Sequence, residues 1–108
     1  MNERKLELRS IVLDIVFKRA GVTYAPSQFG HLTAGVAEVL SRNETQQPYS
    51  ASVFQPEARL SESDWLLVQE VFWDLVSERV LTPGMNSANP DFPWFRIHSQ
   101  AESNLASV

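Results

Sequence analysis

The sequence predicts a mainly α-helical domain with a small β-hairpin, an α+β fold in which three helices precede two C-terminal strands. The first observation is that segments 3–20, 27–42 and 61–79 repeat their apolar residues with the period of an α-helix. The second is that two short apolar segments, 80–82 and 94–98, flank a loop rich in proline, glycine and asparagine. The third is the length of 108 residues, which suits one domain.

Composition and charge restrict the class of protein. One folded unit is expected over residues 1–98, followed by a polar, flexible tail over 99–108. The net charge of −4 argues against a strongly basic nucleic-acid binder. The absence of cysteine excludes disulfides and zinc–thiolate sites. No apolar stretch reaches the roughly 18 residues that span a bilayer, so we expect no membrane partner and a cytoplasmic location.

The first helix, 3–20, is apolar over more than half of its circumference and should end at Gly21. A helix on one side of a small domain needs an apolar stripe only a little over about 100° wide. We therefore expect this helix to form a homodimer or to bind a protein partner, because monomers rarely expose a large apolar patch. The predicted interface consists of Leu8, Ile11, Val12 and Ile15. The alternative is that the linker over 43–60 covers the surplus apolar surface.

The second helix, 27–42, follows Pro26, a residue that suits a helix start. Its apolar residues fall within one narrow sector, although Gly30 and Gly35 each lower helix propensity by about 1 kcal/mol relative to alanine. Residues 43–60 then contain two prolines and many small polar side chains, which oppose a helix. A linker of this length inside a compact domain is either functional or contains a small element.

The third helix, 61–79, has the clearest start signal, because Ser61 is a good N-cap and acidic residues follow it. Its apolar sector is broad. It holds Trp65, Val68, Val71, Phe72, Leu75 and Val76, with Leu66, Leu67 and Trp73 beside it. Its polar stripe is acidic, and the pair Asp74 and Glu78 is interpreted as a solvent-facing stripe rather than an acid–base pair.

The hairpin strand 94–98 alternates, so Phe95 and Ile97 share one face. We expect both to join Phe72, Leu75 and Val76 in one core. The aromatic residues that gather in the last 44 positions are expected to fill this core. The alternative, stacking of single-stranded bases on these rings, needs a basic groove, and this half of the chain is acidic.

The passage from Trp73 to Gly84, followed by Phe95-Arg96-Ile97, leads from a helix through a hydrophobic strand into a loop and back. It resembles the winged helix-turn-helix superfamily over about residues 27–98. The resemblance implies that the hairpin is a wing, and that the helix before it commonly enters the DNA major groove. It therefore implies a DNA-binding module, either a small regulator or the DNA-contacting part of a larger system.

Positive side chains are the candidates for contacts with duplex DNA, because phosphate contacts need only positive charge and reach. The candidate DNA-binding residues are Arg4, Lys5, Arg9, Arg42 and Arg96, together with Asn86 as a groove contact. The alternative function is a winged-helix protein-interaction or dimerisation module that does not bind DNA. It is favoured by the acidic third helix, by the net charge, and by a loop at 83–93 that lacks Lys and Arg.

Catalytic chemistry is not expected. His31 and His98 are the only histidines, they lie 67 positions apart, and a metal site would need two more ligands. The glycines are isolated, so no phosphate-binding loop is present, and no serine has a recognisable base partner. We expect no enzyme activity, no cofactor, no metal and no small-molecule substrate.

Overall fold

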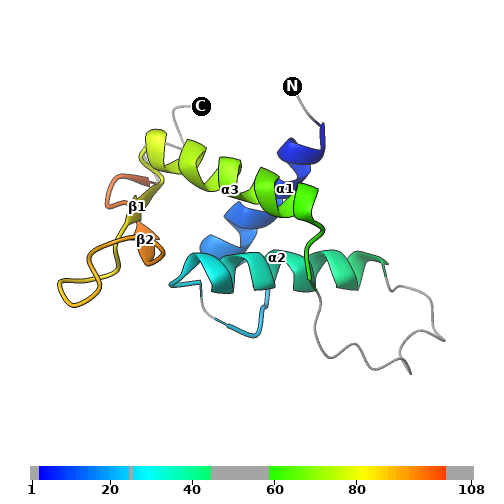
Figure 1. Cartoon of the computed structure of the whole chain (residues 1–108), viewed down its shortest axis with the longest axis horizontal. Helices are drawn as coiled ribbons and strands as arrows, with labels where there is room; N and C mark the ends of the chain where they lie inside the picture. Colours follow the sequence, from blue (N-terminus) through cyan, green and yellow to red (C-terminus); the bar gives the residue numbers. More distant parts are fainter. Residues whose placement is uncertain (1–2, 25, 45–58, 102–108) are drawn as a thin grey trace.

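The computed structural model describes residues 3–24, 26–44 and 59–101. These residues form three helices and one antiparallel two-stranded sheet, which confirms the predicted α+β class (Figure 1). The helices are α1 (Glu3–Val16), α2 (Phe29–Glu44) and α3 (Glu62–Ser77), and the strands are β1 (Leu81–Pro83) and β2 (Phe95–Ile97). Most of the predicted linker, residues 45–58, lies outside the described residues, as do residues 102–108 of the predicted tail.

The predicted end of the first helix at Gly21 is wrong, because α1 ends at Val16. Lys18 adopts a left-handed φ of 61°, and the Arg19 N–H donates to the Asp14 carbonyl at 2.7 Å. This six-residue closure is the Schellman way of ending a helix, and it usually places glycine at the left-handed position. A lysine occupies that position here, so no glycine in the sequence marks the end.

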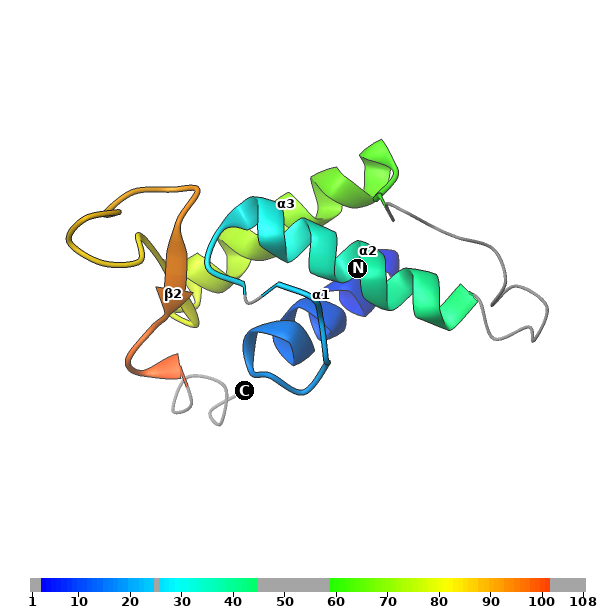
Figure 2. The ribbon, with the colours of Figure 1, turned by 90° about the horizontal axis from the view of Figure 1, so that it is seen from below.

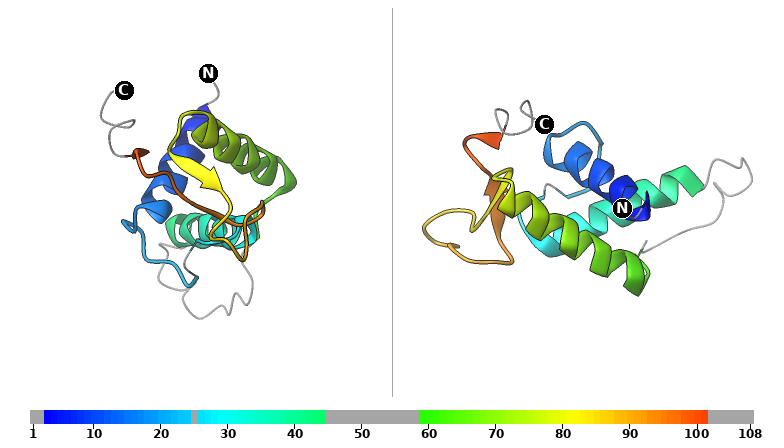
Figure 3. Two further views of the ribbon diagram at one scale, coloured as in Figure 1. Left: turned by 90° about the vertical axis from the view of Figure 1, so that its left-hand side faces the viewer. Right: turned by 90° about the horizontal axis from the view of Figure 1, so that it is seen from above.

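All three helices share one core (Figures 2 and 3). α1 packs against both α2 and α3, which lie on adjacent sides of it. The close approach of α1 and α2 occurs at Gly35, where a Cβ atom would lie 3.3 Å from Cδ1 of Ile15. The buried side chains of the helices include Leu8, Ile11, Val12, Ile15, Val16, Phe29, Leu32, Val36, Val68, Val71, Phe72 and Leu75.

The first-helix interface predicted from the sequence is therefore wrong as an exposed surface. Its four members, Leu8, Ile11, Val12 and Ile15, are all buried within the chain's own core. The wide apolar stripe of α1 is accounted for because two helices cover it instead of one. The surplus that remains partly exposed lies at other positions of α1, of which Leu6 is 46% exposed.

The hairpin lies at one end of the helices and pairs Leu81 with Ile97 and Pro83 with Phe95 (Figures 1 and 3). Gln28, just before α2, forms an isolated bridge with Trp94, which fastens the hairpin to the second helix. α3 packs along β1, and the Phe95 N–H at the start of β2 donates to the Ser27 carbonyl at 3.0 Å. Phe95 reaches the core, as expected.

Two sequence predictions near the C-terminal end are corrected by the structure. Ile97 is 41% exposed instead of buried, because the core reaches only Phe95 at the start of β2 and Ile97 is the last residue of that strand. The predicted tail also starts too early. The Ala101 N–H donates to the His98 carbonyl at 3.0 Å, and the Ala101 methyl group is buried against the core. Phe72 and Leu75 are buried as predicted, and Val76 packs partly buried against them.

Candidate functional site

α3 has two contrasting sides, and the first of them faces α1. Three basic residues of α1, Arg4, Lys5 and Arg9, form ion pairs with acidic residues of α3. We call this array the α1–α3 seam. Its acidic members are Asp64, Glu70, Asp74 and Glu78. Three of the sequence-predicted DNA contacts thus lie together, but they lie against carboxylates.

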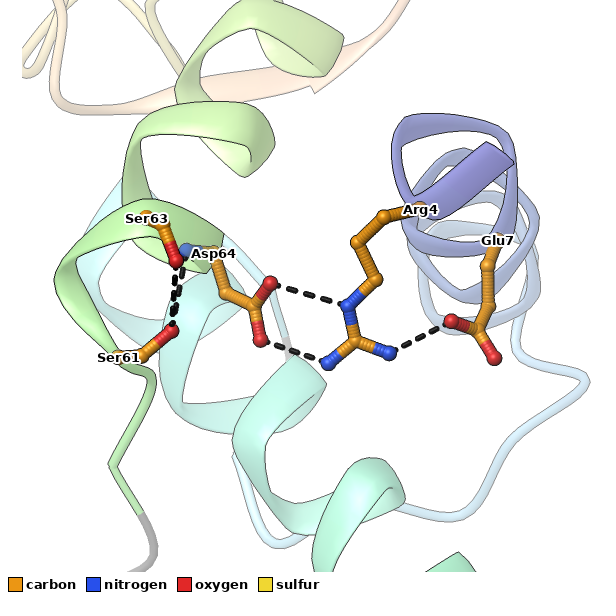
Figure 4. A network of polar contacts seen from close by, with 5 residues as sticks. All are labelled: Arg4, Glu7, Ser61, Ser63 and Asp64. Carbon is orange, nitrogen blue, oxygen red and sulfur yellow. Dashed lines mark hydrogen bonds and ion pairs between the residues drawn. The ribbon is translucent and has the colours of Figure 1, made fainter. Parts of the chain in front are cut away.

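The first pair of the seam joins Arg4 to Asp64 beside the N-cap of α3 (Figure 4). Ser61 caps α3 as predicted, since its hydroxyl oxygen accepts a hydrogen bond from the Asp64 N–H at 3.2 Å. Nε and one terminal nitrogen of Arg4 donate to the two Asp64 carboxylate oxygens at 3.0 and 2.7 Å. The other terminal nitrogen donates to Glu7 at 2.6 Å. The hydrogen bonds from Arg4 lower the pKa of the Asp64 carboxyl below its ordinary value.

The remaining pairs extend the seam along α3. The Lys5 ammonium lies 2.9 Å from Asp74 and 3.2 Å from Glu70, so one cation bridges two carboxylates one turn apart. Hydrogen bonding to Asp74 raises the pKa of Lys5. Arg9 donates two hydrogen bonds to Glu78, at 3.0 and 2.8 Å. The expectation that Asp74 and Glu78 form a solvent-facing stripe missed these partners, because they come from a helix more than sixty positions away.

The other three candidate DNA contacts serve local structure on separate elements. Arg42 pairs with Glu38 one turn earlier on α2. The Asn86 side-chain oxygen accepts hydrogen bonds from the N–H groups of Ala88 and Asn89 and so shapes its own turn. Arg96 donates to the carbonyl of Gly84 at 2.8 Å, across the base of the hairpin loop.

An aromatic cluster joins α3 to α2 and the hairpin. Its inner rings, Phe29, Phe72 and Phe95, are buried, and Phe72 contacts the other two at 5.5 and 5.2 Å between centroids. Edge-to-face geometry prevails in these pairs, which is the favourable arrangement for aromatic rings. The prediction that the aromatic residues of the last 44 positions fill a core is confirmed for Phe72 and Phe95, and Phe29 of α2 joins them.

The outer members of the cluster are exposed on the second side of α3. Trp65, Trp73 and Phe92 are 38%, 41% and 39% exposed, and Leu66 beside them is 47% exposed. We call these four residues the α3 outer face. Phe92 comes from the hairpin loop and lies 5.3 Å from the Trp73 ring and 5.6 Å from the Phe29 ring, and Phe29 in turn contacts Trp65 at 5.5 Å. Trp73 and Phe92 are therefore in direct contact, and Trp65 is joined to them through the buried Phe29.

Sequence reasoning placed Trp65 in the core and Leu66 and Trp73 at its margin, and so missed the outer face. A usable signal was present, because the apolar sector of α3 is wider than one packed side needs.

In the described ranges, no group of three or more His, Cys, Asp or Glu residues could hold a metal ion. No helix among these residues is long and apolar enough to cross a membrane.

No family model, curated protein or solved structure matches this chain. The winged-helix resemblance therefore rests on the order of the elements.

Proposed function

We propose that the chain is a winged-helix-like module that binds a protein partner through the α3 outer face and does not bind duplex DNA. The observation that carries this proposal is the contrast between the two sides of α3. The cations suited to phosphate contacts are paired with carboxylates, and large apolar side chains lie exposed on the part of α3 that α1 does not contact through these pairs.

Electrostatics disfavour DNA at the seam. Three cations face four carboxylates of α3, and Glu7 adds a fifth negative charge through its contact with Arg4. A DNA phosphate approaching Arg4, Lys5 or Arg9 would have to displace these acids while remaining close to them, which is repulsive. Duplex binding gains its affinity from cations that neutralise phosphates and release counterions, and this array offers no surplus of positive charge.

The α3 outer face has the composition of a protein interface. Its four residues are large and apolar, and tryptophan in particular is enriched among the residues that dominate binding energy. The rings rest on buried aromatic residues, so they are held in place before a partner arrives. Exposed apolar patches of this kind mark interaction sites in proteins that are otherwise well packed.

The winged-helix resemblance supports the same surface. Three helices run into an antiparallel hairpin, and the last helix leads directly into its first strand. In that superfamily the helix before the wing is commonly the recognition element. Here that helix carries indole and leucine side chains on its outer side and acidic residues on the side facing α1, which suits a protein ligand better than a DNA groove.

The DNA part of the proposal is tested by titrating the full chain into a fluorescently labelled random duplex. We expect no binding at about 20 mM salt, where phosphate contacts are strongest. Saturable binding that weakens steeply with salt, and that is lost on charge reversal of Arg4 or Arg9, would overturn the proposal.

The protein part is tested by site-specific photo-crosslinking in the native cells. A photoreactive amino acid replaces Leu66 on the outer face or, as a matched control, Leu6 on α1. The two leucines are 47% and 46% exposed. We expect a protein adduct of defined mass at position 66 and none at position 6. Adducts at both positions alike, or none at position 66, would contradict the proposal.

A further inference from the structure

The chemistry around the α3 outer face restricts its partner. Four of the acidic residues of this region, Asp64, Glu70, Asp74 and Glu78, are paired with cations of α1 in the seam. Glu62 and Asp91 lie outside the seam and border the outer face, since Glu62 is exposed one turn before Leu66 on α3 and Asp91 is exposed directly before Phe92. The apolar residues therefore lie in a negative surrounding, and an approaching partner gains from positive charge at its rim.

The same charges disfavour a second copy of this chain as the occupant. A two-fold dimer through this face would bring Glu62 and Asp91 of one copy near the same acids of the other, since such interfaces are self-complementary. Like charges at close range cost free energy that four apolar side chains would have to offset. The partner must therefore differ in charge from this surface.

The spacing of the outer face fits a helix. Trp65 and Trp73 are eight residues apart, which corresponds to about 12 Å along the α3 axis. A partner helix presents apolar anchors at i, i+4 and i+7 over about 10 Å, so its anchors match the length of the face. α3 is itself a ridge of side chains, against which a second helix packs by ordinary interdigitation.

We infer that the α3 outer face receives an amphipathic helix of another protein, with large aliphatic anchors on one side and Lys or Arg residues flanking them. This inference rests on the proposed function and names the class of its partner. The anchors pack between Trp65, Leu66 and Trp73, and Phe92 closes one side. The flanking cations lie near Glu62 and Asp91.

The test uses synthetic helical peptides of about 18 residues, five turns in length. One carries leucine at i, i+4 and i+7 with lysine flanks, a second keeps the leucines with glutamate flanks, and a third keeps the lysines with alanine in place of leucine. Fluorescence anisotropy of the labelled peptides measures binding to the full chain. We expect binding of the first peptide only, and weakening as salt rises because the flanks contribute electrostatically.

Matched variants of the chain locate the binding. Leu66→Ser should weaken binding of the first peptide about tenfold, as loss of a central interface side chain does. Leu6→Ser, at a leucine of equal exposure on α1, should leave it unchanged. The double variant Glu62→Gln and Asp91→Asn should weaken binding several-fold and flatten its salt dependence, whereas Glu3→Gln should not.

Three results would overturn the inference: equal binding of the lysine and glutamate peptides, equal effects of Leu66→Ser and Leu6→Ser, or no binding of any peptide. If a protein adduct still forms at position 66 in cells, the proposed function stands and only the partner class is wrong. If position 66 yields no adduct, the proposed function fails with it. Thermal unfolding of each variant confirms that the surface substitutions leave the fold intact.

Discussion

The two sides of α3 differ in how their side chains find partners. Toward α1, four carboxylates are matched by three cations, and the contacts are as short as 2.7 Å. On the outer side, two indoles, a leucine and a phenylalanine are about two-fifths or more exposed. The polar side forms ion pairs with another helix of the chain, and the apolar side faces outward. Residue type alone is thus a poor guide to which side of a helix is available for binding.

The contrast has a physical cause. The partners of each side of a helix depend on which elements lie next to it, and α1 brings cations that form ion pairs with the acidic stripe of α3. The hairpin covers only the far end of the aromatic cluster, through Phe95 and part of Phe92. The apolar residues beyond that reach stay exposed. Four predictions test whether a change on one side of α3 leaves the other side unaffected.

The largest effect is expected at the residue on which the outer face rests. Phe72→Ala should lower the free energy of unfolding by about 3–5 kcal/mol, because it removes a buried ring that contacts the rest of the cluster. Urea denaturation measures this change in the free energy of unfolding. A loss below about 1 kcal/mol would mean that the cluster is not the core of the domain.

Gly84→Ala should disturb the hairpin loop and leave the seam intact. Gly84 has a φ of 90°, and a Cβ atom there would overlap with the carbonyl oxygen of Pro90. We expect a loss of about 1–3 kcal/mol from strain at this position. NMR chemical shifts should change around Phe92 and stay constant around Arg9. The control is Gly21→Ala, where no atom lies within 4 Å and no such strain arises. Equal losses of unfolding free energy at both glycines would contradict the strain expected at Gly84.

The Arg4–Asp64 pair should make a modest contribution that depends on pH. Because Arg4 is partly exposed, screening limits the expected cost of Asp64→Asn to about 1 kcal/mol or less at neutral pH. The folded pKa of Asp64 lies below its unfolded value. The stabilisation is therefore present above about pH 4 and is lost as pH falls through the folded pKa. The difference in urea midpoint between wild type and variant should therefore become smaller from neutral to acidic pH. A difference that grows on acidification would contradict this sign.

The smallest effect is expected on the outer face itself. Leu66→Ser should change the free energy of unfolding by no more than about 0.5 kcal/mol, because the side chain is exposed in the isolated chain. Leu6→Ser serves as the matched comparison in the same denaturation experiment. A large loss at Leu66 alone would show that it supports the fold, and the distinction between the two sides of α3 would then disappear.

The local features of this protein could be predicted from the sequence. The number and order of the helices, the hairpin after them and the capping of α3 by Ser61 all depend on residues that are neighbours along the chain. Periodicity and capping act over a few residues, so their physical causes are visible in a short stretch of sequence. The burial of Phe95 against Phe72 also follows from such patterns.

Only the tertiary structure decided which surfaces pack or pair within the chain and which stay exposed. Periodicity showed that α1 is apolar over most of its circumference, but the packing of both α2 and α3 on it determined that Leu8 and Ile15 are buried. Likewise, the acids of α3 gained partners sixty or more positions away, and the core ended at Phe95, which left Ile97 of the same strand exposed. Such outcomes depend on the relative placement of whole elements, which arises from the sum of many weak contacts and is not contained in any local pattern.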